Sequence, residues 1–267
     1  MSHLICPVCH MALARGERTF SCSSGHSFDI ARQGYVNLLL QNGGQHGDNA
    51  LMIEARRRFL SRGYYEPLAN ALKRAVSAYL KSDASLLDIG CGEGYYTSHL
   101  RAALGDKAKI YAFDISRDAL KAAAKRHLSA TLFVASAYDV PVAEDSMDGV
   151  CLFFSPYARE EILRVLKKNG FFFMAIPAER HLFGLKQALY DDPYLNRPED
   201  TDIPGLRLVS DVRLEGRITL NSQEEIADLF AMTPYYYKTS HTGKERLAAL
   251  STLTTETDFR FLVYQKL

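Results

Sequence analysis

The segment from Leu86 to Tyr96 constrains the fold of this chain more than any other stretch. It is an apolar run that leads into Gly90, Gly92 and Gly94 and then into an amphipathic segment. Glycine accepts positive φ and has no Cβ, so a ligand can lie against the backbone while the next helix offers free N–H groups. The segment predicts a strand, a tight turn and a helix start that bind a nucleotide or nucleoside cofactor, although a purely structural turn also requires glycine.

A second apolar run, from Ile110 to Asp114, supports the cofactor interpretation. It ends in a carboxylate 26 residues after Asp88. In a doubly wound sheet, an acid at this place accepts hydrogen bonds from ribose hydroxyls. Dinucleotide enzymes use the same arrangement, but the spacing here is D-x-G-x-G-x-G rather than G-x-G-x-x-G, because an acid precedes the first glycine.

Five motifs in this order resemble the class I S-adenosylmethionine-dependent methyltransferases. They are Asp88 to Gly94, Asp114, Val134 to Ala137 before Val140-Pro141, the strand Met147 to Leu152, and Glu160 to Gly170. The resemblance implies an α/β fold with a doubly wound, Rossmann-like sheet of seven strands. It also implies S-adenosylmethionine as the cofactor.

The same resemblance implies which residues face which part of that cofactor. The glycine turn, including Asp88 and Glu93, would face the methionine part, Asp114 the ribose, and Ser136 with Ala137 the adenine. Many relatives carry an acid where this chain has Ser136. A side-chain contact to the adenine amine is therefore not implied here.

Three of the five cysteines and one histidine form a metal-binding pattern near the N-terminus. Cys6 and Cys9 are followed, after twelve residues, by Cys22 and His26. Three thiolates and an imidazole suit tetrahedral zinc, with His10 as an alternative ligand. Four protein ligands leave no position for an activated water, so a structural rather than a catalytic Zn²⁺ is predicted. The other cysteines, Cys91 and Cys151, are interpreted as small core residues.

Together with the zinc pattern, several further motifs resemble the bacterial 23S ribosomal RNA (guanine-N1)-methyltransferases that have an N-terminal zinc domain. These are F-D-x-A-R-x-G-Y-V-N-L-L from Phe28, A-R-x-x-F-L-x-x-G-x-Y, R-H-L and M-T-P-Y. The resemblance implies the same four zinc ligands and cofactor contacts from Tyr65, the Gly92-Glu93 turn and His181. Relatives often have Gly-Pro before Arg-His, where this chain has Ala178-Glu179.

The residues themselves leave the roles of Tyr65 and His181 open. Tyr65 follows a helix break, so its ring could cover the cofactor or be an ordinary half-buried tyrosine. His181 follows the apolar run from Phe171 to Pro177, at the carboxyl edge where open α/β sheets bind ligands. A lone histidine is otherwise usually structural.

The chain divides into a zinc domain (1–40), a helical linker (41–80) and a methyltransferase domain (81–267). Helical periodicity is predicted from Asp48, as N-cap, to Leu80, with a break at Gly63. We expect strands over 206–220 and 259–264, a loop over 190–204, and a helix that begins at Ser222.

Charge and composition indicate the partner and the compartment. Residues 1–81 hold ten Lys and Arg against five Asp and Glu, whereas the remainder holds 22 against 26. This polarity suggests an anionic partner at the N-terminal side, although basic helix faces are often only solvated. There is no apolar run of about 20 residues and no signal peptide. We expect a cytoplasmic protein that binds ribosomal RNA, with no DNA or membrane partner and with a homodimer as an option.

The sequence does not identify the base that removes the guanine N1 proton. Asp29, Asp48, Tyr157 and His181 are candidates, and backbone carbonyls or solvent could suffice. Two alternatives stay open. One is a small-molecule methyltransferase, and the other is a non-catalytic zinc RNA-binding module on a degenerate methyltransferase fold.

Overall fold

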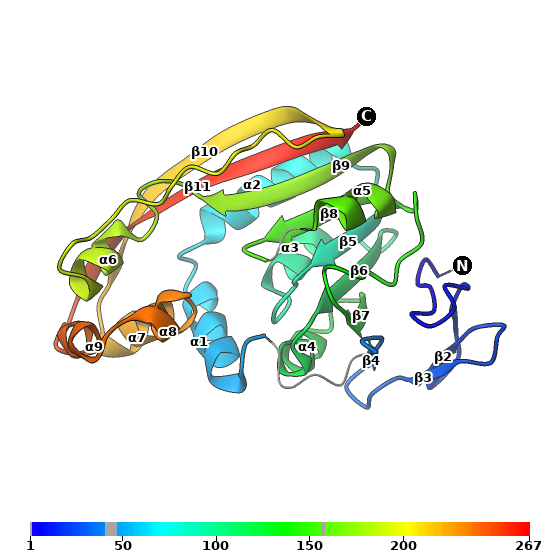
Figure 1. Ribbon diagram of the computed structural model, residues 1–267, viewed down its shortest axis with the longest axis horizontal. Helices are drawn as coiled ribbons and strands as arrows, with labels where there is room; N and C mark the ends of the chain where they lie inside the picture. The colour runs from blue at the N-terminus through cyan, green and yellow to red at the C-terminus, as the bar shows by residue number, and fades with distance from the viewer. Residues whose placement is uncertain (1, 41–46, 156–157) are drawn as a thin grey trace.

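The computed structural model describes residues 2–40, 47–155 and 158–267, and its centre is one large, mostly parallel sheet (Figure 1). The strand order is β10-β11-β9-β8-β5-β6-β7-β4. The strands are β4 (Tyr35–Asn37), β5 (Ser85–Ile89), β6 (Lys109–Asp114), β7 (Thr131–Val134), β8 (Met147–Phe153), β9 (Leu166–Pro177), β10 (Leu206–Leu220) and β11 (Leu253–Lys266). Only the pairings of β11 with β9 and β10 are antiparallel within this sheet.

The predicted doubly wound α/β fold is confirmed, and the sheet is one strand longer than expected. The eighth strand is β4, which pairs in parallel with β7 through contacts such as Val36 with Phe133. Tyr35–Asn37 were predicted to lie inside the zinc domain. In the fold, this strand extends the edge of the methyltransferase sheet, because its backbone finds hydrogen-bond partners there.

Helices lie on both faces of the sheet, so the central strands are buried from both sides. The helices are α1 (Ala50–Ser61), α2 (Glu66–Tyr79), α3 (Tyr95–Leu104), α4 (Arg117–Ala124), α5 (Arg159–Val165), α6 (Phe183–Leu189), α7 (Gln223–Ala231), α8 (Tyr235–Lys238) and α9 (His241–Ala248). Along β8, Val150 and Leu152 belong to one apolar cluster, and Cys151 and Phe153 belong to the other. This alternation explains why β8 reads as a continuous apolar run.

The order of the strands changes direction at β5, and open α/β sheets bind ligands at such a point. β5 pairs with β6 on one side and with β8 on the other, in parallel on both sides. A crevice at such a switch point lies outside the carboxyl ends of the strands. The turn from Ile89 to Gly94 leaves β5 at this edge.

The helix signals were right except for one cap. Helix α1 begins after Asn49, whose side-chain oxygen accepts a hydrogen bond from the Met52 N–H at 3.0 Å. The prediction of Asp48 as N-cap was wrong by one residue, because the carboxylate of Asp48 instead pairs with Arg56. Ser222 caps α7 as predicted, by accepting from the Glu225 N–H at 3.2 Å.

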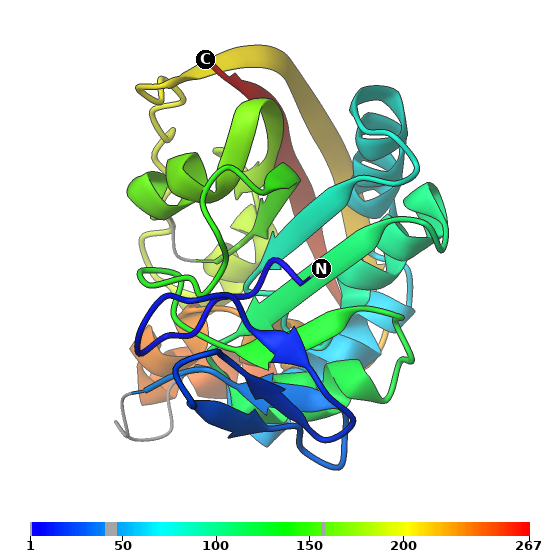
Figure 2. The same cartoon turned by 90° about the vertical axis from the view of Figure 1, so that its right-hand side faces the viewer.

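The N-terminal residues form a small three-stranded sheet beside the large one (Figure 2). Its strands are β1 (Ala14–Arg15), β2 (Thr19–Ser21) and β3 (Ser27–Asp29). The unit is attached to the segment before β8, where the Ile5 N–H donates to the Pro141 carbonyl at 3.0 Å. Leu4 and Leu13 pack into the apolar cluster of the large domain.

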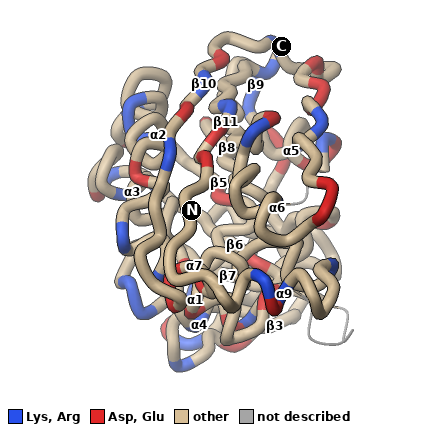
Figure 3. Tube along the Cα trace, turned by 90° about the vertical axis from the view of Figure 1, so that its left-hand side faces the viewer, with Lys and Arg blue, Asp and Glu red and all other residues tan. Residues whose placement is uncertain are grey.

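Four of the ten positive charges of the N-terminal part are paired with acids, and all four belong to α1 and the residue that follows it. Arg58 donates to Asp228 of α7 at 2.5 Å, and Arg62 contacts Glu225 on the same helix. Figure 3 shows Lys and Arg interspersed with Asp and Glu over the face that it presents. The excess along the sequence therefore does not form one isolated basic block on α1. In the described part of the chain, no helix is long and apolar enough to span a membrane.

Candidate cofactor and zinc sites

The three glycines of the turn have different reasons to be glycine. All have positive φ, at 67°, 57° and 82° for Gly90, Gly92 and Gly94. A Cβ on Gly90 would overlap the Ser155 hydroxyl, and one on Gly94 would lie 2.6 Å from Leu128. A Cβ on Gly92 would meet nothing closer than Arg56, at 3.8 Å. Packing thus requires glycine at positions 90 and 94. At Gly92, which we call the crest of the turn, the space beside the backbone is empty, so a ligand could lie there.

Asp114 links this turn to the end of β6. Its carboxylate accepts hydrogen bonds from the Gly92 N–H at 2.9 Å and from the Ser116 N–H at 2.8 Å. Burial raises its pKa, and these two donors oppose the rise. A carboxylate has about four lone-pair positions, so two remain for the hydroxyl donors of a ribose. The two hydroxyl groups of a ribose therefore match the free acceptor positions of the Asp114 carboxylate.

Asp88 lies beneath the turn rather than on its open side. It is 1% exposed, and the Thr97 hydroxyl donates to it at 2.5 Å. Burial raises its pKa to about 7. Asp88 consequently ties the end of β5 to α3, and its contribution to a ligand would pass through the position of the turn.

Glu93 is a buried acid with one unsatisfied oxygen. Its Oε2 accepts from the Arg126 Nε at 2.5 Å, while Oε1 has no partner among the described residues. Burial raises its pKa despite Arg126. An orphaned buried acceptor is costly unless a donor reaches it. Such an atom beside the turn is consistent with a ligand that carries an amino group, as S-adenosylmethionine does.

Tyr65 and His181 form a buried pair, although 116 residues separate them in sequence. The Asp258 N–H donates to His181 Nδ1 at 3.3 Å, so the proton of the neutral ring is on Nε2, 3.4 Å from the Tyr65 oxygen. Burial lowers the pKa of His181 to about 3. The ring is therefore neutral near pH 7, and the Tyr65 hydroxyl keeps its own proton to donate.

The predicted adenine segment follows β7, next to Asp114. The Ala135 N–H donates to the Asp114 carbonyl at 3.3 Å, which brings the two strand ends together. The Ser136 hydroxyl accepts from the Tyr138 N–H at 3.2 Å. Ala137 packs at the margin of an apolar cluster. The segment thus offers an apolar surface and backbone groups, and its one hydroxyl is engaged locally.

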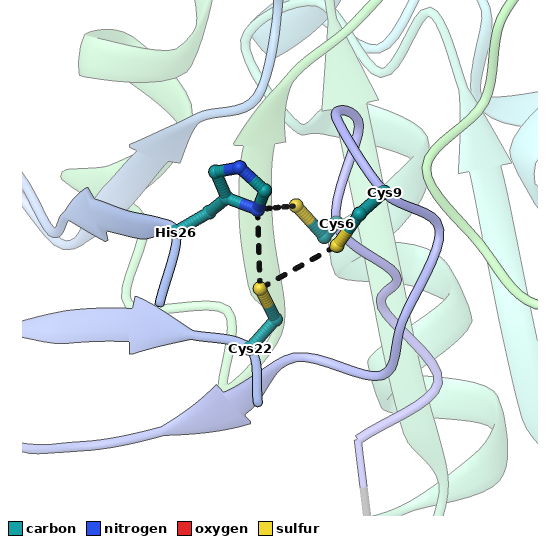
Figure 4. A group of neighbouring side chains, drawn as sticks. All are labelled: Cys6, Cys9, Cys22 and His26. Carbon is teal, nitrogen blue, oxygen red and sulfur yellow. Dashed lines mark hydrogen bonds between the residues drawn. The ribbon is translucent and has the colours of Figure 1, made fainter. Parts of the chain in front are cut away.

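The four predicted zinc ligands converge as tetrahedral coordination requires (Figure 4). Cys9 Sγ lies 3.6 Å from Cys22 Sγ, and His26 Nδ1 lies 3.6 Å from Cys6 Sγ and 3.4 Å from Cys22 Sγ. Zinc bonds of about 2.3 Å to sulfur and 2.0 Å to nitrogen place ligand atoms roughly 3.5–3.8 Å apart.

The donor chemistry of the cluster also fits zinc. The Met11 N–H helps to hold the pKa of Cys9 at about 6, which favours the thiolate that binds metal. His10, the alternative ligand, is not part of the cluster. Cys6, Cys9, Cys22 and His26 are therefore placed as the residues that would hold a structural zinc.

The three candidates for a general base that the structure describes are placed poorly or already engaged. Asp29 lies exposed on β3 of the small sheet, far along the chain from the turn. Asp48 pairs with Arg56, and His181 is buried with both ring nitrogens engaged. Tyr157 lies outside the described residues. None of the three described candidates therefore offers a free acceptor beside the turn.

A cavity of about 370 Å³ lies at the carboxyl ends of β8 and β9. It is closed on one side by the segment between α6 and β10. Its lining comprises Leu152, Phe154, Ser155, Met174, Ala175, Ile176, Pro177, Glu199, Asp200 and Ile203. Four of these lining residues were not predicted from the sequence as site residues: Phe154, Ser155, Glu199 and Asp200. Their only sequence signal was the position of the first two at the end of a buried strand, and the acids fell in a segment interpreted as a loop.

The sheet, the glycine turn and the acid after β6 define a class I S-adenosylmethionine-dependent methyltransferase. A family model described as "Methyltransferase domain" matches residues 86–170, and one described as "RlmA, N-terminal", a zinc ribbon, matches residues 4–42. A crystal structure of MccD protein superimposes with a TM-score of 0.50 at 17% identity, covering 75% of this chain and 98% of that one. This likeness concerns the fold alone.

Curated relatives narrow the class. A 23S rRNA (guanine(748)-N(1))-methyltransferase of Streptomyces fradiae is 34% identical over 192 residues, covering 70% of this chain and 68% of that protein. A Micromonospora griseorubida protein assigned as a 23S rRNA (guanine-N(1)-)-methyltransferase is 37% identical over 210 residues, covering 71% and 70%. The chain belongs to this family of zinc-containing 23S rRNA (guanine-N1)-methyltransferases.

Proposed function

We propose that this protein transfers a methyl group from S-adenosylmethionine to N1 of a guanine in a hairpin loop of 23S ribosomal RNA. The observation that carries the proposal is the presence, on one chain, of a four-ligand zinc site and an intact glycine turn with Asp114. Relatives that bear the name of this activity match about 70% of the chain. The proposal includes a cytoplasmic location and RNA rather than DNA as the substrate.

The cofactor would supply a methyl group on a positively charged sulfur, which leaves as a neutral thioether. Methyl transfer is an in-line displacement, so the main task of the protein is alignment. Asp114 would hold the ribose, the Gly92 crest would leave room for the ligand, and the Tyr65 hydroxyl would offer a donor close by. The neutral His181 would orient Tyr65 without adding a charge.

The position of the target atom decides which RNA can react. Guanine N1 lies on the pairing edge, so the base must be unpaired or extruded from its helix. A hairpin loop meets this requirement at low cost. The zinc ribbon, attached beside the sheet, would add a rigid surface for the RNA around the extruded base.

The test is incubation of the protein with labelled S-adenosylmethionine and 23S rRNA that lacks the modification. We expect incorporation of one methyl group and an arrest of primer extension at one guanine, because a methyl on the pairing edge stops reverse transcription. Incorporation into a metabolite extract but not into RNA would support a small-molecule methyltransferase instead. Absence of cofactor binding by calorimetry would support a non-catalytic RNA-binding protein.

A further inference from the structure

The cavity at the ends of β8 and β9 shares a wall with the cofactor turn. Ser155 lines the cavity, and its side chain also lies against Gly90, where a Cβ would overlap its hydroxyl. A group bound in the cavity would therefore lie one side chain away from the glycine turn. In an in-line transfer the reacting atoms must approach to about 3–3.5 Å, so the acceptor has to bind beside the cofactor site.

The cavity has the size and the walls of a site for one planar base. Its volume of about 370 Å³ is at the lower end of the range for small-ligand pockets. Leu152, Met174 and Ile203 supply apolar surface, and Pro177 closes the end of β9. Such walls accept the faces of a purine without demanding polar partners from them.

Phe154 provides an aromatic surface at the mouth of this cavity. The residue is 47% exposed, and its backbone has a positive φ of 55°, which is rare for a bulky residue. Strain of this kind is concentrated at functional sites. The ring lies 5.6 Å from that of Phe259 and 6.4 Å from that of Tyr65. An exposed ring held in this way is suited to stack on an unpaired base.

Two carboxylates complete the lining, and they differ in their contacts. Asp200 already accepts a hydrogen bond from the Asp202 N–H at 2.9 Å. Glu199 has no hydrogen bond or ion pair with any other described residue. The pairing edge of guanine presents two adjacent donor groups, N1–H and the 2-amino group. A free carboxylate is the side chain that complements both, because it accepts only.

We propose that this cavity, defined by Phe154, Ser155, Met174, Glu199 and Ile203, holds the target guanine, and that Glu199 takes its N1 proton. The inference rests on the proposed function. Phe154 stacks on the base, and Glu199 accepts from the 2-amino group and from N1–H. The carboxylate removes the N1 proton first and becomes a carboxylic acid. The freed electron pair of N1 then forms the bond to the methyl carbon as the bond from sulfur to that carbon breaks. Glu199 finally returns the proton to solvent.

Single-turnover methylation by Glu199→Gln and Glu199→Ala tests the assignment. We expect rates lower by about 10²–10⁴-fold, the usual contribution of a positioned acid or base, with unchanged affinity for S-adenosylmethionine. The exposed Asp192→Asn in the same segment is the matched control, since Asp192 does not line the cavity. Its rate should equal that of the unchanged protein.

A second substrate separates a direct contact from a structural effect. Ribosomal RNA fragments with inosine at the target position lack the 2-amino group. The unchanged protein should prefer guanine to inosine, and Glu199→Ala should lose most of this preference. A Glu199→Ala variant with full activity, or with the preference intact, overturns the assignment of Glu199. If the unchanged protein methylates no RNA, the proposed function itself is wrong, so the two failures are distinguishable.

Discussion

The zinc ribbon and the glycine turn are each built from closely spaced residues, yet different forces hold them. The strands of the ribbon have two or three residues each, and most of their side chains are partly or fully exposed. A unit this small cannot fold on apolar burial alone, so the metal supplies its stability. The turn leaves β5, whose five residues are all buried. We therefore expect that loss of zinc from the ribbon leaves cofactor binding at the turn intact, and the reverse.

Loss of a zinc ligand should have the largest effect. Structural zinc contributes about 10–16 kcal/mol in isolated zinc-finger peptides, so Cys22→Ser should release the metal and unfold the ribbon. Cofactor binding should persist, because the turn does not use the metal. Metal analysis and calorimetry measure the two properties, with the exposed Ser23→Ala as control. Unchanged zinc content in Cys22→Ser would contradict the ligand set.

Gly92→Val should have the opposite effect, with loss of cofactor binding and retention of zinc. A branched side chain at φ 57° strains the backbone and occupies the open crest of the turn. We expect calorimetric affinity for S-adenosylmethionine to fall below detection while zinc content stays at one per chain. Gly105→Val is the control for backbone strain away from the site, because Gly105 also has a positive φ and no atom near its Cβ position. Equal loss of affinity in both variants would mean that strain, not the crest, causes the effect.

Asp114→Asn should weaken binding of S-adenosylmethionine at the cofactor site. A hydrogen bond to a charged group contributes about 1.5–3 kcal/mol, so the affinity for S-adenosylmethionine should fall by roughly 10- to 100-fold. The amide must also accept from both Gly92 and Ser116, which only its oxygen can do. Binding measured with adenine alone should change little. If both ligands lose affinity equally, Asp114 shapes the turn rather than contacting the ribose.

Lowering the pH should destabilise the large domain, which contains His181, and this is the smallest of the expected effects. The pKa of His181 falls from 6.5 to about 3 on folding, so its contribution to stability is full above pH 6.5 and declines as the pH falls below that value. The decline should reach about 1.4 kcal/mol at pH 5.5. Urea unfolding of the large domain at pH 7.5 and 5.5 measures it. His181→Gln should remove this part of the pH dependence. If the variant keeps the full dependence, the buried neutral state of His181 is not its cause.

The sequence by itself determined the features that depend on short spacing. Positive φ and close packing restrict Gly90 and Gly94 to glycine, and four metal ligands within one short segment converge for any fold of that hairpin. The doubly wound fold was implied by five short motifs, whose order along the chain resembles that of class I methyltransferases. These constraints act over short distances along the chain or repeat periodically, so they can be recognised from the amino-acid sequence alone.

Only the tertiary structure decided which distant groups meet. It paired Tyr65 with His181 across 116 residues, turned Asp88 beneath the turn, and added β4 to the large sheet. It also brought Glu199 from a loop-like segment to the cavity that Phe154 and Ser155 line. These meetings depend on how whole elements pack, and packing energy is shared among many residues that no short motif records.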